Sequence, residues 1–294
     1  MSAIRTVTTG TVRRSARSKA ATRRAGEFIR LLPAIIWALV ILIPIVFLVF
    51  ISLRTPEAFA ANPLGLPISL DLRNYTDAWN QGTIPSAFAN NLIVTAASVI
   101  GVTVLSSLAA YAIVRWAGRA GGRLYVYFVL GLIVPFQLGL PILFKIWAQL
   151  GLVDSLPGVI LVQIGAGLPL AVFLYAGFLR SVPLELEEAA RLDGAGDIRI
   201  FVSVVFPLLR PATATVVILT AISVWNDLIV SLFFLSTPTN QTLPLTVVGF
   251  VSIVSSNQPL IFACAVITVL PIIVLFIFLQ RFFMSGLTAG ALRG

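Results

Sequence analysis

The sequence predicts an all-α protein that crosses a membrane several times. Of its 294 residues, 59% are hydrophobic and only 11% are charged, and the mean hydropathy is +1.02. A soluble domain carries about 25% charged residues. Six apolar runs reach the length needed to cross roughly 30 Å of hydrocarbon. They predict six spanning helices, near residues 31–53, 92–114, 124–149, 157–179, 212–235 and 260–280.

The basic residues predict which side of the membrane each connection occupies. All of them except Arg54, Arg73 and Lys145 fall on one side of a six-span arrangement. Basic residues resist translocation, so the crowded side is predicted to be cytoplasmic, with both termini inside. This placement accounts for the net charge of +9, and no nucleic-acid partner is expected.

Residues 1–30 form a basic polar tail ahead of the first span. One interpretation is a transit peptide rich in Arg and Ser. The other is a disordered tail that touches anionic lipid and helps to set the orientation. The chain has no histidine and a single cysteine, Cys264, which excludes a disulfide framework and a Cys/His metal site. No metal site is predicted.

The external segment 54–91 is too polar for lipid, and we expect it to carry a short surface helix. A second external connection, between the last two spans, has no charge. The third and fourth spans contain residues that bend helices or let them approach closely, namely Pro135, Gly139, Pro141, Gly165, Gly167 and Pro169. Either these residues serve packing and gentle bending, or the breaks line a pathway.

Two charges fall inside the predicted spans, Lys145 in the third and Asp227 in the fifth. Charges within a membrane are costly and usually face a partner or the bundle interior. Both lie in the outer half of the membrane, so a structural ion pair, a role in gating or docking, and direct substrate contact all remain open. Candidates for lining a substrate path are Gln137, Gln163, Trp225 and Asn226, although each could equally join helices by hydrogen bonds.

The cytoplasmic stretch 181–211 predicts a helix–turn–helix lying at the membrane surface. Ser181 is a suitable N-cap, the residues from Leu184 to Asp193 favour a helix, and Gly194 is a natural stop. Glu187 and Arg191 stand four residues apart and could pair, and Asp197 could cap a second short helix. The alternative is an ordinary amphipathic loop at the interface.

This stretch resembles the EAA motif of ABC importer permeases, which reads E-A-A, three residues, G, nine residues, I, one residue, L-P. The matching residues are Glu188, Ala189, Ala190, Gly194, Val204, Phe206 and Pro207, where Val204 and Phe206 replace the usual Ile and Leu. The strings "SLAAYAIVRW", "VPFQLGLPILFKIWAQLGLVDS" and "VWNDLIVSLFFLS" extend the match. Residues 31–294 are similar to the six-span subunit of the maltose-type carbohydrate permeases, which implies a type I ABC importer permease fold in a prokaryotic inner or plasma membrane.

The resemblance implies that the loop forms coupling helices that dock on a separate cytoplasmic ATPase. Glu188 is expected to pair with a basic residue of that ATPase, the Ala189–Ala190 step to allow close approach, and Gly194 to make the turn after Asp193. A terminal segment, which includes Gly286, Gly290, Arg293 and Gly294, is expected to reach between the ATPase subunits.

The resemblance also implies the partners: a second permease subunit in a heterodimer, an ATPase dimer, an extracytoplasmic solute-binding protein, membrane lipid and a sugar substrate. The only lysines, Lys19 and Lys145, do not follow a glycine, so the chain has no Walker A loop for holding phosphates. We therefore expect a non-enzymatic subunit without a cofactor, whose partner binds the ATP. A secondary transporter and a scaffold or sensor without transport are the alternatives.

Overall fold

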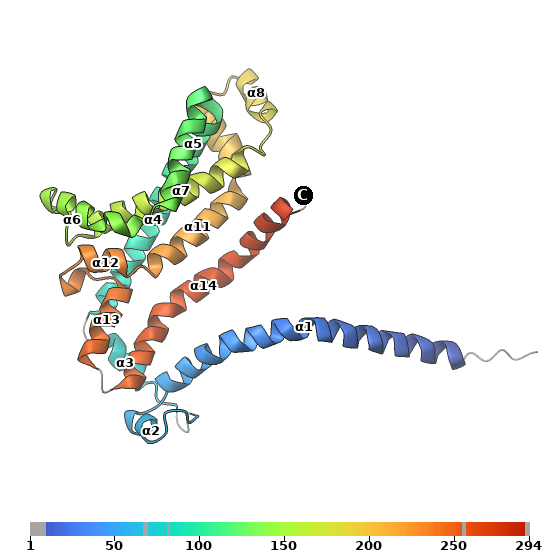
Figure 1. The fold of residues 1–294 in the computed structure, drawn as a ribbon, viewed down its shortest axis with the longest axis vertical. Helices are drawn as coiled ribbons and strands as arrows, with labels where there is room; N and C mark the ends of the chain where they lie inside the picture. The colour runs from blue at the N-terminus through green and yellow to red at the C-terminus, as the bar shows by residue number, and fades with distance from the viewer. Residues whose placement is uncertain (1–9, 67–69, 81–82, 255–256, 292–294) are drawn as a thin grey trace, which may run out of the picture.

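The protein is described by a computed structural model that covers residues 10–66, 70–80, 83–254 and 257–291. Within these residues the chain is helical and contains no strand. Its main helices are α1 (Gly10–Ser52), α4 (Ile84–Tyr111), α5 (Gly118–Ile133), α7 (Leu156–Leu179), α11 (Arg210–Trp225) and α14 (Gln258–Ala291). Figure 1 shows α4, α7, α11 and α14 side by side, with α8 (Glu185–Leu192) at one end of the molecule and α2 (Pro56–Ala61) and α3 (Arg73–Asn80) at the other.

Four helices are long and apolar enough to cross a membrane, and there are up to six spans if each of two bent helix pairs counts as one. The four lie at Leu31–Ser52, Ile84–Trp116, Leu156–Leu179 and Gln258–Phe278. The second therefore begins well before residue 92. Its first eight residues, "IPSAFANN", were predicted to be external because the segment is polar, but Asn90 and Asn91 donate to the carbonyl oxygens of Thr239, Gln241 and Trp225. Tertiary contacts thus satisfy the side-chain amides of these two asparagines.

The third predicted span is broken rather than kinked. Helix α5 ends at Ile133, and the chain then turns by 89° into a 3-10 turn, η2 (Phe136–Gly139), followed by α6 (Leu140–Gln149). Val134 and Pro135 both have extended backbones at the break. Proline cannot donate the helical hydrogen bond, and it disfavours helix at the preceding residue. In contrast, α7 runs without interruption through Pro169.

The fifth predicted span, 212–235, also consists of shorter pieces. Helix α11 ends at Trp225, and a separate α12 (Ile229–Phe234) follows. Between them, the Asp227 carboxylate accepts hydrogen bonds from the backbone N–H groups of Val230 and Ser231. A short acidic side chain that binds backbone donors in this way starts a new helix instead of continuing the old one. The expectation of one continuous helix to residue 235 was wrong.

The close packing of α4 on α7 forms the centre of the bundle. Gly101 and Gly167 leave room for their neighbours, because a Cβ atom added at these positions would lie 2.4 Å from the Ile164 side chain and 2.8 Å from that of Val102. Small residues at helix contacts of this kind bring helices together where lipid supplies no hydrophobic driving force between them. The buried residues nearer to α8 include Tyr111, Tyr175 and Leu209.

The first helix leaves this bundle. Figure 1 shows most of α1 projecting away, and the side chains of residues 31–46 are exposed. Helix α1 begins at Gly10, so within the described part of the chain the tail is a helical extension of the first span rather than the disordered segment expected. The tail contains several alanines and arginines, which are good helix formers.

The end of the molecule where α2 and α3 lie (Figure 1) is held by a buried arginine. Arg54 is 4% exposed and donates to the carbonyl oxygens of Ala58, Asn62, Pro63 and Gly65, which fixes α2 and the turn after it. The expected surface helix is thus present as two short ones, α2 and α3.

The charge-free connection between the last two predicted spans contains a 3-10 turn, η4 (Pro238–Asn240), and a helix, α13 (Leu243–Ile253). Sequence reasoning left this connection as a loop.

Candidate functional site

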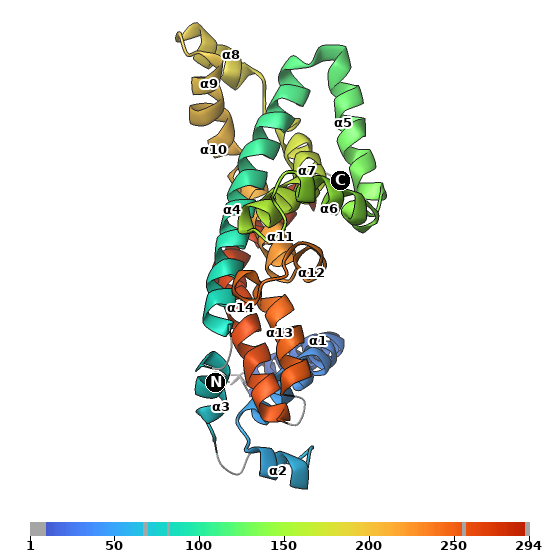
Figure 2. The same ribbon diagram turned by 90° about the vertical axis from the view of Figure 1, so that its left-hand side faces the viewer.

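The predicted helix–turn–helix is present at the end of the molecule where α8 lies, as Figure 2 shows. Helix α8 spans Glu185–Leu192, and α9 (Asp197–Ile200) continues through a π-helical turn, η3 (Phe201–Val205), into the short α10 (Phe206–Leu208) and α11. Gly194 lies between α8 and α9 with φ +83°, a conformation that favours glycine. It therefore makes the turn as expected.

The start of α8 differs from the prediction. Ser181 does not cap the helix: its hydroxyl donates to the carbonyl oxygen of Phe178, at the end of α7. The N-cap position belongs to Leu184, which makes no side-chain hydrogen bond to the helix end. Asp197 is the first residue of α9, and Gly196 occupies its N-cap position.

One face of the loop is free of contacts with the bundle. Glu188, Ala189 and Asp193 are exposed, whereas Ala190 and Pro207 are partly buried. Two large apolar side chains near the turn are almost fully solvent-accessible: Leu192 is 90% exposed and Ile198 is 82% exposed. A short helix that presents apolar side chains and a carboxylate beside small residues is suited to docking on another protein.

The opposite face of α8 is tied to the membrane helices through Glu187, which is 2% exposed. Its carboxylate accepts a hydrogen bond from Arg115 Nε at 2.7 Å and another from the Tyr111 hydroxyl at 2.9 Å. The predicted pair between Glu187 and Arg191 is therefore not formed. Arg191 instead pairs across the turn with Asp197 at 2.9 Å, and this hydrogen bond raises the pKa of Arg191.

Sequence reasoning missed Tyr111 and Arg115. A signal was present, because they lie at the end of a predicted span and directly after it, on the side predicted to be cytoplasmic, four residues apart and hence on one helix face. However, the neighbouring residues in the sequence do not specify which loop packs against Tyr111 and Arg115. The i,i+4 pair between Glu187 and Arg191 would contribute only about 0.2–0.5 kcal/mol, so the two buried hydrogen bonds, one from Arg115 and one from Tyr111, prevail.

The two charges predicted within the spans do not meet. Lys145 lies exposed on α6, and no ion pair joins it to Asp227, both residues being within the part that the structure describes. Asp227 instead binds the first backbone N–H groups of α12, at 3.4 Å for Val230 and 3.2 Å for Ser231. The direct pair considered from the sequence is thus replaced by helix capping.

The four polar candidates for a substrate path occupy different environments. Trp225 is 3% exposed and donates from Nε1 to the Thr268 carbonyl oxygen at 2.9 Å, so it joins α11 to α14. Asn226 is exposed and donates to the Ile222 carbonyl oxygen. Gln137 is exposed in η2, at the break of the third span.

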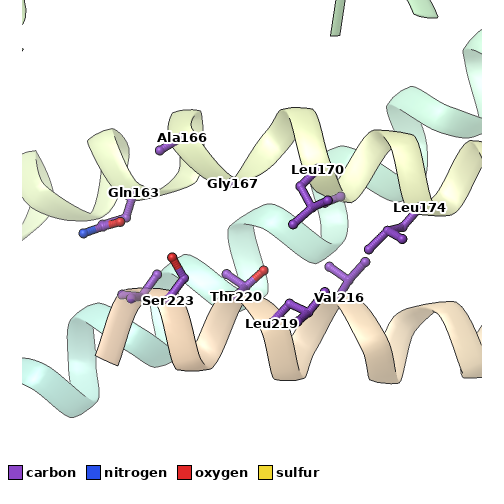
Figure 3. A pocket seen from close by; sticks show the side chains of 11 residues that line it. Gln163, Ala166, Gly167, Leu170, Leu174, Val216, Leu219, Thr220 and Ser223 are labelled. Carbon is purple, nitrogen blue, oxygen red and sulfur yellow. The ribbon is translucent and has the colours of Figure 1, made fainter. Parts of the chain in front are cut away.

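Gln163 lines a cavity of about 110 Å³ between α7 and α11. Figure 3 shows its amide together with the hydroxyl groups of Thr220 and Ser223, facing this space from the two helices. The remaining wall is apolar and includes Leu170, Leu174 and Val216. A few polar groups on an apolar wall are typical of small-molecule sites.

The predicted terminal contact can be described only in part. Helix α14 continues through Gly286 and Gly290 to Ala291. Arg293 and Gly294 lie outside the described residues.

Comparison with known proteins places the chain in a family. The family model described as "Binding-protein-dependent transport system inner membrane component" matches residues 102–288. The chain is 35% identical over 277 residues to the "Melibiose/raffinose/stachyose import permease protein MelC" of Bacillus subtilis, with 94% of this chain and 100% of that protein covered. It is 31% identical over 261 residues to the "Probable starch degradation products transport system permease protein AmyC" of Thermoanaerobacterium thermosulfurigenes, with 88% and 94% covered.

A solved structure shares the fold. It is the crystal structure of a bacterial ABC transporter involved in the import of the acidic polysaccharide alginate, which matches with a TM-score of 0.77 at 24% identity and covers 89% of this chain and 98% of its own. The exposed face of the loop and the apolar helices are consistent with these matches. The chain belongs to the family of binding-protein-dependent transport system inner membrane components and is an ABC transporter permease.

Proposed function

We propose that this chain is the permease subunit of an ATP-driven importer for a sugar or oligosaccharide, and that it couples to a separate ATPase through the loop 181–211. The observation that carries the coupling is the free face of α8 and α9, where Leu192 and Ile198 are exposed beside Glu188 and Ala189. The substrate class rests on relatives whose names refer to melibiose, raffinose, stachyose and starch degradation products.

The proposed cycle is alternating access. ATP binding closes the ATPase dimer and moves α8 inward, and the bundle then opens outward to receive the sugar from an extracytoplasmic solute-binding protein. A second permease subunit supplies the other half of the path. Each bent helix pair counts as one span, giving six, with both termini cytoplasmic. The segment from Gly286 to Gly294 is a second contact with the ATPase.

Within this chain, the cavity at Gln163 is the proposed wall of the sugar path. Its amide and the hydroxyl groups of Thr220 and Ser223 can exchange hydrogen bonds with sugar hydroxyl groups, since each can both donate and accept. At about 110 Å³ the cavity is too small to enclose an oligosaccharide. It therefore suits one side of a path that is completed by the second subunit.

Purification of the tagged full-length chain from membranes tests the coupling. We expect an ATPase and a second permease subunit to accompany it, and proteoliposomes containing the complex to take up melibiose or raffinose only with ATP. Glu188→Arg should remove the ATPase while retaining the second permease. Glu57→Arg, the same change at an exposed residue of α2 at the opposite end, is the control. A chain recovered without an ATPase, or a Glu188→Arg variant that behaves like the control, would refute the proposal.

A further inference from the structure

Two adjacent glutamates of α8 face opposite ways. Glu188 points to solvent, whereas Glu187 is 2% exposed and holds the Arg115 guanidinium and the Tyr111 hydroxyl. We call Tyr111, Arg115 and Glu187 the Glu187 cluster. Among the described residues, these are the only side-chain hydrogen bonds between α8 and a membrane helix, because the other side-chain bond of α8 stays within the loop, from Arg191 to Asp197.

Arg115 connects α8 with a third element. Besides Glu187, its guanidinium donates to the carbonyl oxygens of Leu179, at 3.3 Å, and Val182, at 2.9 Å. These carbonyl groups lie at the end of α7 and at the start of the loop. One side chain that is mostly shielded from water, with 13% of its surface exposed, therefore links the end of α4, the end of α7 and α8.

Irregular helix brings the cluster together. Arg115 lies in a π-helical turn, η1 (Ala112–Trp116), that continues α4. The Tyr111 ring packs against Trp116 at 5.2 Å and against Phe201, which begins the π-helical turn η3, at 5.1 Å. Single π-helical turns are rare and are frequently found at functional sites. Two of them meet at the Glu187 cluster.

We propose that Glu187 is a positioning residue that makes α8 move together with the cytoplasmic ends of α4 and α7, so that displacement of the loop reaches the translocation path. A buried carboxylate cannot leave its donors without exposing an unpaired charge to an apolar surrounding, so the loop and these helix ends are held as one unit. This inference rests on the proposed function, because it assigns how movement started by the ATPase enters the bundle.

The first test needs no ATPase. In the full-length chain, Glu187→Gln and Arg115→Gln should each accelerate hydrogen exchange of the α8 backbone amides at least about tenfold. Arg119→Gln removes the same charge from an exposed residue of α5, four residues further along the chain, and should change nothing. Equal exchange in Arg115→Gln and Arg119→Gln would overturn the anchoring.

The second test measures coupling in proteoliposomes that contain the complete transporter. Glu187→Gln and Arg115→Gln should leave ATPase binding intact and ATP hydrolysis within about twofold of the unmodified complex, while the sugar moved per ATP falls at least about tenfold. The double variant should be no worse than either single one, because both act through one contact. A parallel loss of assembly, hydrolysis and uptake would show a merely structural role and overturn the inference.

The two tests separate this inference from the proposed function. If the unmodified chain binds no ATPase or transports without ATP, the proposed function fails, and the hydrogen-exchange result still decides whether Glu187 anchors α8. If the unmodified complex couples ATP to uptake and the variants couple equally well, only the inference fails.

Discussion

Replacing Gly194 with alanine is expected to weaken the turn between α8 and α9 by an amount that follows from its geometry. The φ angle of Gly194 is +83°, and a Cβ atom added there meets nothing within 4 Å. The cost is therefore confined to the backbone, roughly 1–2 kcal/mol for an L-residue in the left-handed region. Lower entropy of the unfolded chain returns about 0.4–1 kcal/mol. The net loss is about 1 kcal/mol, or about fivefold in the opening equilibrium of the turn.

Hydrogen exchange of the peptide backbone measures this opening directly. The N–H of Gly194 donates to the Arg191 carbonyl oxygen at 3.1 Å, and the N–H of Ala195 donates to that of Ala190 at 3.0 Å. Both amides should exchange about fivefold faster in Gly194→Ala. Gly194→Asn should have a smaller effect, because asparagine tolerates the left-handed region.

Gly196→Ala provides the matched control two residues away. Gly196 has φ −73°, a value open to any residue, and an added Cβ atom there also meets nothing within 4 Å. This variant should leave the exchange of the amides at positions 194 and 195 unchanged, because any cost of alanine at the N-cap position falls on the first turn of α9. If the amides at positions 194 and 195 exchange at the same rate in both alanine variants, the left-handed conformation of Gly194 does not stabilise the turn, and the geometric reasoning is refuted.

Two further predictions concern the start of α7 and the turn before it. The Thr237 hydroxyl and the backbone N–H groups of Thr237 and Ser236 hold the pKa of the Asp154 carboxyl below its usual value. A lowered carboxyl pKa contributes stability that is complete above the unfolded pKa of about 3.9 and disappears as the pH falls through the folded value. The difference in thermal unfolding between the unmodified protein and Asp154→Asn should thus stay constant from about pH 5 to 8 and shrink below about pH 4; a gap that widens in acid would contradict this. Gly158→Ala would put a Cβ atom 2.0 Å from the Leu152 carbonyl oxygen, and it should destabilise the fold by about 1–3 kcal/mol. Gly165→Ala, in the same helix with open space, is the control, and equal unfolding temperatures for the two variants would count against the contact.

Local chemistry was enough to predict much of this molecule. Apolar runs identified the four helices that are long and apolar enough to cross a membrane, because each needs only its own length and composition. Glycine located the turn at Gly194, because the restriction acts on its own backbone. Proline and glycine marked the third and fourth spans as places for bending or breaks, but they did not show that only the third would break, since α7 runs through Pro169. The spacing of Glu188, Ala189, Ala190 and Gly194 carried the resemblance to ABC importer permeases, and the family match supports it.

Other features depend on residues that are distant in the sequence. The polar segment at the start of α4 can be part of the helix because the Asn91 amide donates a hydrogen bond to the carbonyl oxygen of Trp225, at the end of α11. Trp225 looked equally suited to a substrate path or to packing, and its bond to the Thr268 carbonyl oxygen shows that it joins α11 to α14. Asp227 caps α12 instead of pairing with Lys145, because the bend after Trp225 brings free N–H groups to it.

The two neighbouring glutamates show where this boundary lies. From the sequence alone, residues 184–193 are predicted to form a charged helix beside a membrane, and both Glu187 and Glu188 are suited to solvent. Only the tertiary structure decides that Glu187 turns inward, because Arg115 approaches it from the end of another helix, 72 residues away in the chain. A buried carboxylate requires a donor close in space, and the order of the sequence does not specify which donor that is.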